Sequence, residues 1–302
     1  MTRMTTNKYL KFIFCFLFVW LLINSFNVSA QIRVRNFSVI AFFTAKEDPA
    51  HISFVHEANK WFSMQGEKLK FKYDSTNNWS NLNDTFLSKY QVVLFLDSRP
   101  DSMIQRLAFQ KYMEGGGSWM GFHFSAFALT PSAFNQNWDW YHEDFLGSGE
   151  YKGNTWRPTN AQLSVEQLNH PFTKNLPIVF GAAPNEWYSW KNDIRKNKNI
   201  DVLLSIDSSS FPLGTGPKSY EIWHSGDYPV AWTNKRYRML YFNVGHNDMD
   251  YDGGTNKTLS SSFGSAIQNQ FILNSLLWLG YSSKSVASQT NRKTNTDRPY
   301  RK

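Results

Sequence analysis

Two histidines, His123 and His246, are the residues of this sequence best placed to do chemistry. Each follows a short apolar run typical of a buried strand, at 118–122 for the first and at 238–243 for the second. Ligands of open α/β sheets bind beyond the carboxyl ends of the strands, so we expect the two side chains to converge there. Histidine serves in acid–base catalysis near neutral pH and as a metal ligand. The alternative is that each is a hydrogen-bonded structural histidine.

Carboxylates supply a second kind of candidate. Glu186 directly precedes Trp187 and Tyr188, and burial among these rings would raise its pKa and suit it to acid–base work. Otherwise it is a surface carboxylate on a loop. Thr44 and Asp97 follow the first and third predicted strands, so the same rule places them at the same edge of the sheet.

Acyl transfer through a covalent serine or cysteine is disfavoured. His123 occupies the sharp turn after a central strand, where hydrolases of this layout carry the nucleophile. Ser125 is the fallback nucleophile, but it lies beyond the apex of that turn. The one cysteine, Cys15, lies in the N-terminal apolar run, and cleavage after Ala30 would remove it. The mature chain would then have neither a thiol nucleophile nor a disulfide.

The N-terminus has the layout of a cleavable signal peptide. Residues 1–11 carry three basic side chains and no acid, residues 12–22 are apolar, and residues 28–30 are the small run Val-Ser-Ala. The apolar run is shorter than the about 20 residues of a membrane span. We therefore predict a signal peptide over 1–30, a periplasmic or extracellular location, and no stable membrane span after cleavage. An uncleaved membrane anchor is the alternative.

The formal net charge of +8 does not belong to the predicted domain. The first 30 residues contribute three positive charges and the tail at 283–302 a net five, which leaves residues 31–282 neutral. A neutral domain gives no electrostatic reason to bind nucleic acid. The tail is rich in Ser, Thr and Asn, lacks periodicity, and is predicted to be disordered.

Apolar runs alternate with amphipathic segments through the first half of the chain. The predicted strands are 37–43, 69–73, 92–96 and 118–122. One predicted helix begins at Asp48-Pro49, and two others cover 82–90 and 100–113. We expect Met103, Leu107 and Ala108 to lie on one face of the helix at 100–113.

The second half is looser, with long polar loops. Its predicted elements are strands at 161–165, 202–206, 229–232 and 238–243 and a closing helix at 268–279. Short buried strands separated by helices are typical of a mainly parallel sheet covered on both faces. We therefore predict one α/β domain over 31–282, with an elaborated second half.

Aromatic residues are abundant, at 17% of the chain with 12 tryptophans. Several stand among polar residues, as at 138–142 and 187–190. Aromatic faces with polar edges suit sugars, whose C–H faces stack on rings while hydroxyls find hydrogen bonds. The alternative is that these rings fill a core under long loops.

The chain resembles the ThuA family, the trehalose-utilisation-like proteins, in a series of short motifs and in their order. The resemblance runs from about Phe37 to Gly280. It is carried by Thr44 with 50–52 (Ala-His-Ile), 115–123 (Gly-Gly-Gly-Ser-Trp-Met-Gly-Phe-His), 170–171 (His-Pro), 185–188 (Asn-Glu-Trp-Tyr), 229–232 (Pro-Val-Ala-Trp) and 245–246 (Gly-His). It implies a flavodoxin-like three-layer sandwich similar to class I glutamine amidotransferases, without their catalytic cysteine and with His123 in the comparable turn.

The chain departs from the family pattern in two places. Many relatives carry Asp where this chain has Asn185, and many carry a histidine within the stretch that here spans 147–156. If that histidine is functional in relatives, we expect this chain either to be altered in activity or to have moved the role to Arg157 or Glu150.

The resemblance implies carbohydrate metabolism, with disaccharides, glycosides or their 3-keto derivatives as substrates. One base, His123 or His246, and one proton donor, Glu186, could expel the glycosidic oxygen, with a possible divalent metal on the histidines. These three residues are the predicted catalytic set. The predicted substrate contacts are Thr44, His51, Asp97, Trp138, Tyr188 and Trp232.

Two other functions stay open. A secreted glycosyl hydrolase acting on unoxidised sugar needs two facing carboxylates about 5–9 Å apart, and the sequence offers one good candidate. A non-catalytic carbohydrate-binding module would use the aromatic cleft alone. A nucleotide binder is disfavoured, since the glycines at 115–117 follow a helix and precede a strand, the wrong order for a phosphate-binding turn.

Overall fold

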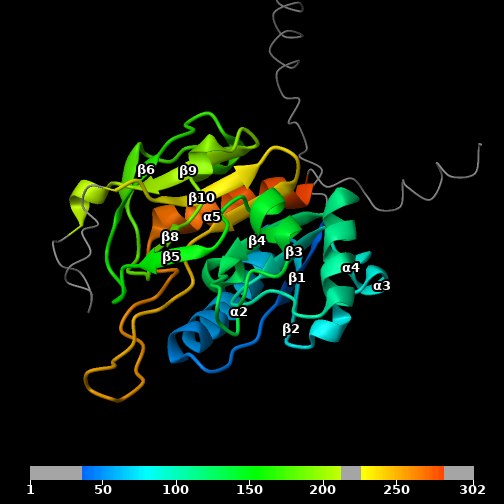
Figure 1. The fold of residues 1–302 in the computed structure, drawn as a ribbon, viewed down its shortest axis with the longest axis horizontal. Helices are drawn as coiled ribbons and strands as arrows, with labels where there is room; N and C mark the ends of the chain where they lie inside the picture. Colours follow the sequence, from blue (N-terminus) through cyan, green and yellow to red (C-terminus); the bar gives the residue numbers. More distant parts are fainter. Residues whose placement is uncertain (1–35, 212–225, 282–302) are drawn as a thin grey trace, which may run out of the picture. The chain divides into compact units, whose positions relative to one another are not determined.

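A nine-stranded sheet organises the domain (Figure 1). The structure is a computed structural model and describes residues 36–211 and 226–281, so the predicted signal peptide with Cys15 and the tail at 283–302 lie outside the described residues. Five neighbouring strands run parallel, in the order β2 (Lys72–Thr76), β1 (Ser38–Phe42), β3 (Val92–Phe95), β4 (Ser118–Phe122) and β11 (Arg238–Phe242).

The sheet continues beyond β11 in antiparallel fashion. The added strands are β10 (Pro229–Asn234), β9 (Ile200–Ile206), β6 (Gln162–Val165) and β7 (Val179–Gly181). A separate two-stranded sheet pairs β5 (Tyr151–Asn154) with β8 (Tyr188–Trp190). This is the predicted single sheet with an elaborated second half, although β5, β7 and β8 are strands that the apolar pattern did not predict.

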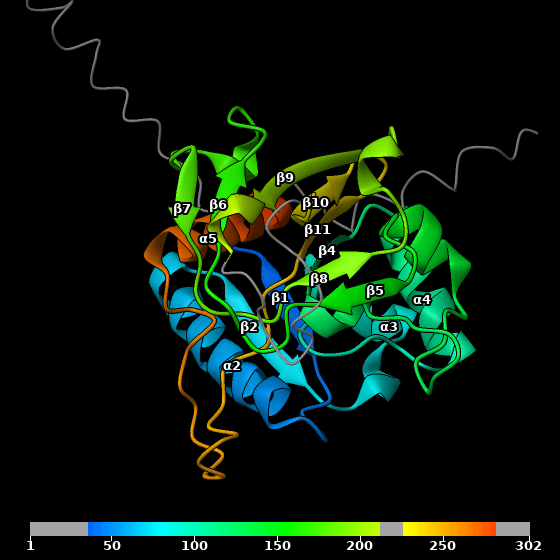
Figure 2. The same ribbon diagram turned by 60° about the vertical axis from the view of Figure 1, so that its left-hand side comes forward.

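Helices cover both faces of the sheet (Figure 2). The helices α2 (Pro49–Leu69) and α5 (Ala266–Tyr281) pack on one face. The other face carries α4 (Met103–Glu114), the short α3 (Asp84–Leu87) and a helical turn at Trp140–Phe145. Single turns lie at Trp79–Asn81, His123–Ala126, Pro171–Thr173, Ile194–Lys196 and Ser208–Ser210. Among the described residues, no helix is both long and apolar enough to cross a bilayer.

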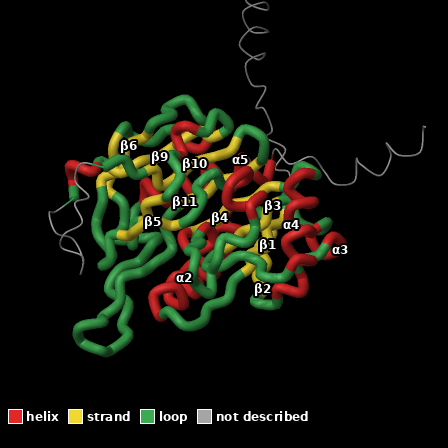
Figure 3. Tube along the Cα trace, in the orientation of Figure 1, coloured by secondary structure: helices red, strands yellow, loops and turns green. Residues whose placement is uncertain are grey.

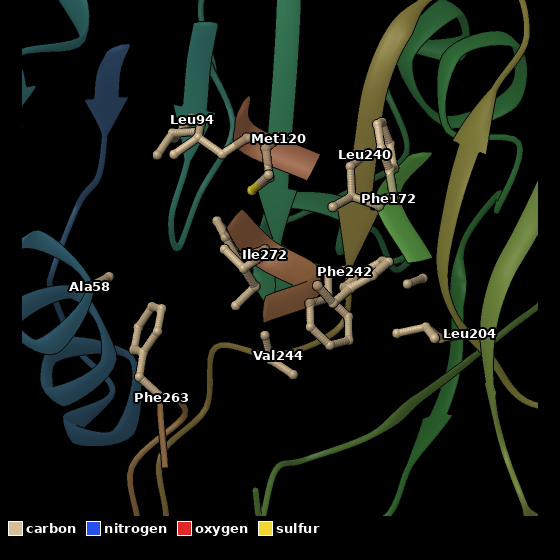
Figure 4. Close-up of a cluster of buried hydrophobic side chains, with 14 of the residues drawn as sticks. Ala58, Leu94, Met120, Phe172, Leu204, Leu240, Phe242, Val244, Phe263 and Ile272 are labelled. Atoms are coloured by element: carbon tan, nitrogen blue, oxygen red, sulfur yellow. The ribbon is translucent and has the colours of Figure 1, made fainter. Parts of the chain in front are cut away.

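The central strands are buried because both of their faces are covered. In β1, Val39 and Ala41 belong to the core under α2 and α5, whereas Ile40 and Phe42 belong to the core under α4. Figure 4 shows part of the first core, where Phe242 and Ile272 lie together. Each fully buried Val, Leu, Ile or Phe contributes about 1.5–3 kcal/mol, so the two cores fix the sheet and its carboxyl edge.

The helix α2 begins as the sequence predicts. The side chain of Asp48 accepts a hydrogen bond from the backbone N of Ala50 at 2.8 Å, with Pro49 in the first turn. The helix ends at Lys70, whose φ of 63° is left-handed. It therefore runs through Leu69, and β2 begins at Lys72 rather than at the predicted 69.

Of the three residues predicted to share the buried face of α4, only Ala108 is buried. Met103 and Leu107 are 62% and 57% exposed, while Phe109 is fully buried. Arg106 is also buried, because its guanidinium donates to the carbonyls of residues 100 and 137 and lies 5.6 Å from the ring centre of Trp138. Because a charged side chain lies on the buried face, the pattern of apolar residues alone did not indicate which face of α4 is buried.

Replacing Phe109 with alanine tests this orientation of α4. The ring packs 4.7 Å from that of Phe95, so we expect Phe109→Ala to lower the free energy of unfolding by about 3–5 kcal/mol. Leu107→Ala, on the exposed side of the same helix, should change it by about 0.5 kcal/mol or less. Urea unfolding followed by circular dichroism measures both. Equal losses in the two variants would contradict the orientation.

Candidate functional site

The site begins where β4 and β11 end side by side. Phe122 of β4 is paired with Phe242 of β11, so the next residues, His123 and Asn243, leave the sheet together. Their side chains meet, with Asn243 Nδ2 at 3.1 Å from His123 Nδ1. His246 follows in the long loop between β11 and α5, which Figure 3 shows in green. The two histidines therefore converge at the predicted edge.

The turn at His123 depends on a glycine in the facing segment. His123 has a φ of 37°, and its carbonyl accepts a hydrogen bond from the Tyr241 hydroxyl at 2.8 Å. Gly245 has a φ of 146°, and a Cβ there would lie 2.8 Å from the Cβ of His123. Only glycine combines this backbone conformation with so close an approach.

A third histidine comes from the first turn of α2. The ring centre of His51 lies 5.3 Å from that of His123 and 5.1 Å from that of His246, and the latter two are 5.5 Å apart. The loop that leads into α2 is held by Asp97, whose carboxylate accepts the backbone N–H groups of Thr44 at 2.7 Å and of the next residue. Asp97 thus positions the loop that leads into the helix carrying His51.

Glu186 faces two of the histidines. Its Oε2 lies 3.3 Å from His123 Nε2 and 4.0 Å from His246 Nε2. Its Oε1 accepts a hydrogen bond from Asn154 Nδ2 at 2.5 Å. The side chain is buried, with 6% of the residue exposed. One carboxylate is therefore shared by the two predicted catalytic histidines.

Asn185 ties the segment of Glu186 to the segment of His246. Its Oδ1 accepts the backbone N–H groups of Gly245 and His246, each at 3.0 Å. Its Nδ2 donates to the carbonyls of Glu186 and Asn243. An amide can donate and accept at once, so Asn185, a departure from the family pattern, is the crosslink of this site.

The tautomer of His123 follows from its neighbours. Asn243 Oδ1 accepts the backbone N–H of Tyr188 at 2.6 Å, which turns its Nδ2 toward His123 Nδ1. Nδ1 is then the acceptor, and the neutral ring carries its proton on Nε2, beside Glu186. His123 Nε2 lies 3.3 Å from Glu186 Oε2, but the two atoms do not form a hydrogen bond of ordinary geometry. The ring of Tyr188 packs over His123, with centres 4.1 Å apart.

Burial and charge oppose each other at these groups. Burial lowers the pKa of His123 and, together with the neighbouring histidines, holds the pKa of His51 well below its usual range. Burial also lowers the pKa of His246, but the contact with Asp48 and the charge of Glu186 outweigh it, so the net shift is upward. For Glu186, burial raises the pKa but His123 and His246 outweigh it. The expectation of a raised pKa at Glu186 is therefore wrong.

Asp48 joins the site, although the sequence showed it only as a helix cap. Its Oδ2 lies 3.7 Å from His246 Nε2. Asp48, His51 and His246 each offer one ligand atom, and these atoms all lie within 4.8 Å of one another. The Nε2 of His51 is buried without a hydrogen-bond partner, a situation that costs about 1–3 kcal/mol. Among the described residues, these three side chains form the group that could hold a metal ion.

Half-buried aromatic rings flank the histidines. Phe124 lies 5.1 Å from His51, Trp156 lies 6.0 Å from His246, and Tyr251 lies 5.2 Å from Trp156, measured between ring centres. The sequence did not single out these rings, because nothing in their local pattern distinguishes them from the many core aromatics.

The other predicted substrate contacts lie elsewhere. Trp138 stacks on Tyr141 at 4.6 Å, and Trp232 donates from Nε1 to the carbonyl of Leu146 at 2.8 Å; both belong to the core under α4. Thr44 bonds to Asp97 rather than to the histidines. The two tryptophans therefore lie in the core, as the alternative interpretation of the aromatic residues expected.

The stretch 147–156 reaches the site through an asparagine. Asn154 donates to Glu186, whereas Arg157 pairs with Asp252 and Glu150 pairs with Lys191. The expected transfer of a role to Arg157 or Glu150 finds no contact with the histidines among the described residues.

Together, fold and site define an α/β sandwich with a buried polar centre beyond its parallel strands. The family model for ThuA, described as trehalose utilisation, matches residues 39–260. The chain belongs to the ThuA family, and the expected class I glutamine amidotransferase-like fold is confirmed.

Solved structures agree with this assignment. The chain is 34% identical to a ThuA-like protein from Bacteroides uniformis ATCC 8492, with a TM-score of 0.71 over 82% of this chain and 93% of that one. A ThuA-like protein from Parabacteroides merdae ATCC 43184 is 18% identical, with a TM-score of 0.57 over 81% and 90% of the two chains, and supports the fold alone. No curated protein matches the sequence.

Removing the side chain of Asn185 tests the crosslink. Asn185→Ala leaves the N–H groups of Gly245 and His246 without acceptors, so we expect a loss of about 2–4 kcal/mol in the free energy of unfolding. Asn160→Ala, at an exposed asparagine, is the matched control and should change it by about 0.5 kcal/mol or less. Denaturant titration checks both, and a neutral Asn185→Ala would rule out the crosslink.

Proposed function

We propose that this protein cleaves glycosides or disaccharides that carry a 3-keto group, by acid–base chemistry at Glu186 and His123. Membership of a family described as trehalose utilisation supports carbohydrate metabolism as the field of action. The observation that carries the proposal is the buried carboxylate of Glu186, 3.3 Å from His123 and 4.0 Å from His246. The half-buried rings of Phe124, beside His51, and of Trp156, beside His246, suit the C–H faces of a sugar.

The reaction is an elimination that needs one base and one acid. A ketone at C3 of the sugar acidifies the hydrogen on C2. A base takes that proton, the freed electron pair forms a double bond between C1 and C2, and the bond from C1 to the glycosidic oxygen breaks. The departing oxygen takes a proton from the acid. Electrons balance within the substrate, so no oxidant or reductant is required.

The hydrogen bonds support roles opposite to those predicted from sequence. His123 Nδ1 is occupied by Asn243, so its Nε2 carries a proton and suits the donor role. Glu186 accepts from Asn154 and faces the same space with Oε2, which suits the base. His246 lies close enough to the same carboxylate to bind an oxygen of a substrate that contacts Glu186.

A direct glycosyl hydrolase is the second candidate, and one contact favours it. Asp48 Oδ2 and Glu186 Oε2 face the same nitrogen, His246 Nε2, at 3.7 and 4.0 Å. A second carboxylate near Glu186, missing from the sequence-based set, is what hydrolysis of an unoxidised glycoside requires. Asp48 also caps α2 through its other oxygen, which makes it the less free of the two.

Turnover of 3-keto-trehalose, followed by NMR, tests the proposal against both alternatives. We expect the wild-type protein to consume it, and Glu186→Gln to lower kcat by about 10²–10⁴-fold because the base is lost. Glu67→Gln, at an exposed glutamate of α2, should leave kcat unchanged.

Unoxidised trehalose is the second substrate in that assay. Consumption of trehalose itself would favour the direct hydrolase. Saturable binding of either sugar without turnover would favour a non-catalytic binding module. Undiminished turnover by Glu186→Gln would remove Glu186 from the mechanism.

We also propose that the protein is exported, on the strength of the signal-peptide pattern at 1–30. Expressed in full in a bacterial host, the mature chain should begin at Gln31 when its N-terminus is read by mass spectrometry. Ala30→Arg should block cleavage, while Ser29→Leu, at the variable middle position of the site, should not. A mature chain that retains Cys15 would contradict this.

A further inference from the structure

We propose that Asp48, His51 and His246 bind one divalent transition-metal ion of the zinc class, beside Glu186. The ligand atoms come from two parts of the chain, the first turn of α2 and the loop after β11, and all lie within 4.8 Å of one another. The inference goes beyond the proposed function and rests on the side-chain geometry alone.

The first support is an imidazole nitrogen with nothing to bind. His51 Nε2 is buried and has no hydrogen-bond partner, and the residue is only 9% exposed. Its ring meets that of His246 nearly at right angles, at 87° and 5.1 Å between centres. Buried polar atoms of native proteins are nearly always paired. A metal ion is a partner that both imidazoles could share.

The second support is the way Asp48 uses its two oxygens. Oδ1 accepts the N–H of Ala50 at 2.8 Å and so caps α2. This hydrogen bond orients the carboxylate with Oδ2 toward His246 Nε2, 3.7 Å away. The backbone N–H of His246 is in turn held by Asn185. The carboxylate of Asp48 is thus oriented by a second contact, as ligands of metal sites usually are, and the backbone of His246 is held in place.

The donor set indicates the class of ion. Two imidazoles and one carboxylate are the ligands of catalytic zinc and non-haem iron sites, whereas Mg²⁺ and Ca²⁺ prefer oxygen ligands. Bonds of about 2.0–2.2 Å put tetrahedral ligands about 3.3 Å apart, so ligand atoms that lie within 4.8 Å of one another must approach by at most about 1.5 Å. Such a movement is within reach of small side-chain rotations.

Three protein ligands leave a coordination position open. Glu186 Oε2 lies 4.0 Å from His246 Nε2 and is therefore next to the site, but the group of three ligand atoms that lie within 4.8 Å of one another does not include it. The open position is therefore expected to present a water or a substrate oxygen to Glu186. This arrangement distinguishes a metal that takes part in binding from a purely structural ion, whose ligands close around it.

Zinc binding by the full chain, measured by isothermal titration after chelator treatment, tests the inference. We expect one Zn²⁺ per chain, with affinity at least about 100-fold weaker in His51→Ala and in His246→Ala. Asp48→Asn keeps an oxygen for the helix cap and should weaken binding while the fold is retained. Glu186→Gln should bind Zn²⁺ as the wild type does, and Mg²⁺ should not saturate the site.

The matched control is His56→Ala, at an exposed histidine of the same helix. Circular dichroism verifies that each variant is folded. Failure of the wild type to take up Zn²⁺, or equal affinity in His51→Ala and His56→Ala, would overturn the site. Zinc binding without turnover of any glycoside would support the site and count against the proposed function alone.

Discussion

The parallel pairing of β4 with β11 is the constraint on which the rest of the site depends. Because Phe122 lies opposite Phe242, the chain leaves both strands at one level, and His123 meets Asn243. A slip of one residue would turn every side chain of one strand to the other face of the sheet. The buried rings on both faces oppose such a slip. The apolar cores therefore determine the geometry of the polar centre, which they contact through the ring of Tyr188 over His123.

Two asparagines convert this register into a defined set of side-chain orientations. Asn185 joins the segments of Glu186 and His246, and Asn243 joins His123 to the backbone of Tyr188. Both amides are buried, where a fully satisfied polar network specifies one arrangement and a partly satisfied one is costly. The histidines and the carboxylate are thus held close together as buried side chains.

The sequence predicted the parts of this structure whose patterns are local. The run at 92–96 is apolar without interruption and 118–122 is largely so, because both faces of β3 and β4 are covered. The pair Asp48-Pro49 predicted the start of α2. The convergence of His123 and His246 followed from the rule for strand ends. Other features depend on distant contacts that no local pattern records. Trp138 and Trp232 look like ligand-binding aromatics but fill the core. Polar strands such as β5 depend on pairing with a strand that is distant in the sequence. Asp48 reads as a cap, and only the folded chain shows its second oxygen facing His246.

Because Asp48 uses both of its carboxylate oxygens, fewer residue types can replace it at this position in evolution. At an ordinary helix start, Ser, Thr, Asn and Asp are nearly interchangeable, since each offers one acceptor. Here one oxygen is committed to Ala50 and the other faces His246. Serine or threonine would keep the helix but leave the histidine unopposed, and asparagine would offer it an amide in place of a charge. A substitution that is silent for stability would therefore be selected against through the site, so the start of the longest helix and the polar centre can only change together.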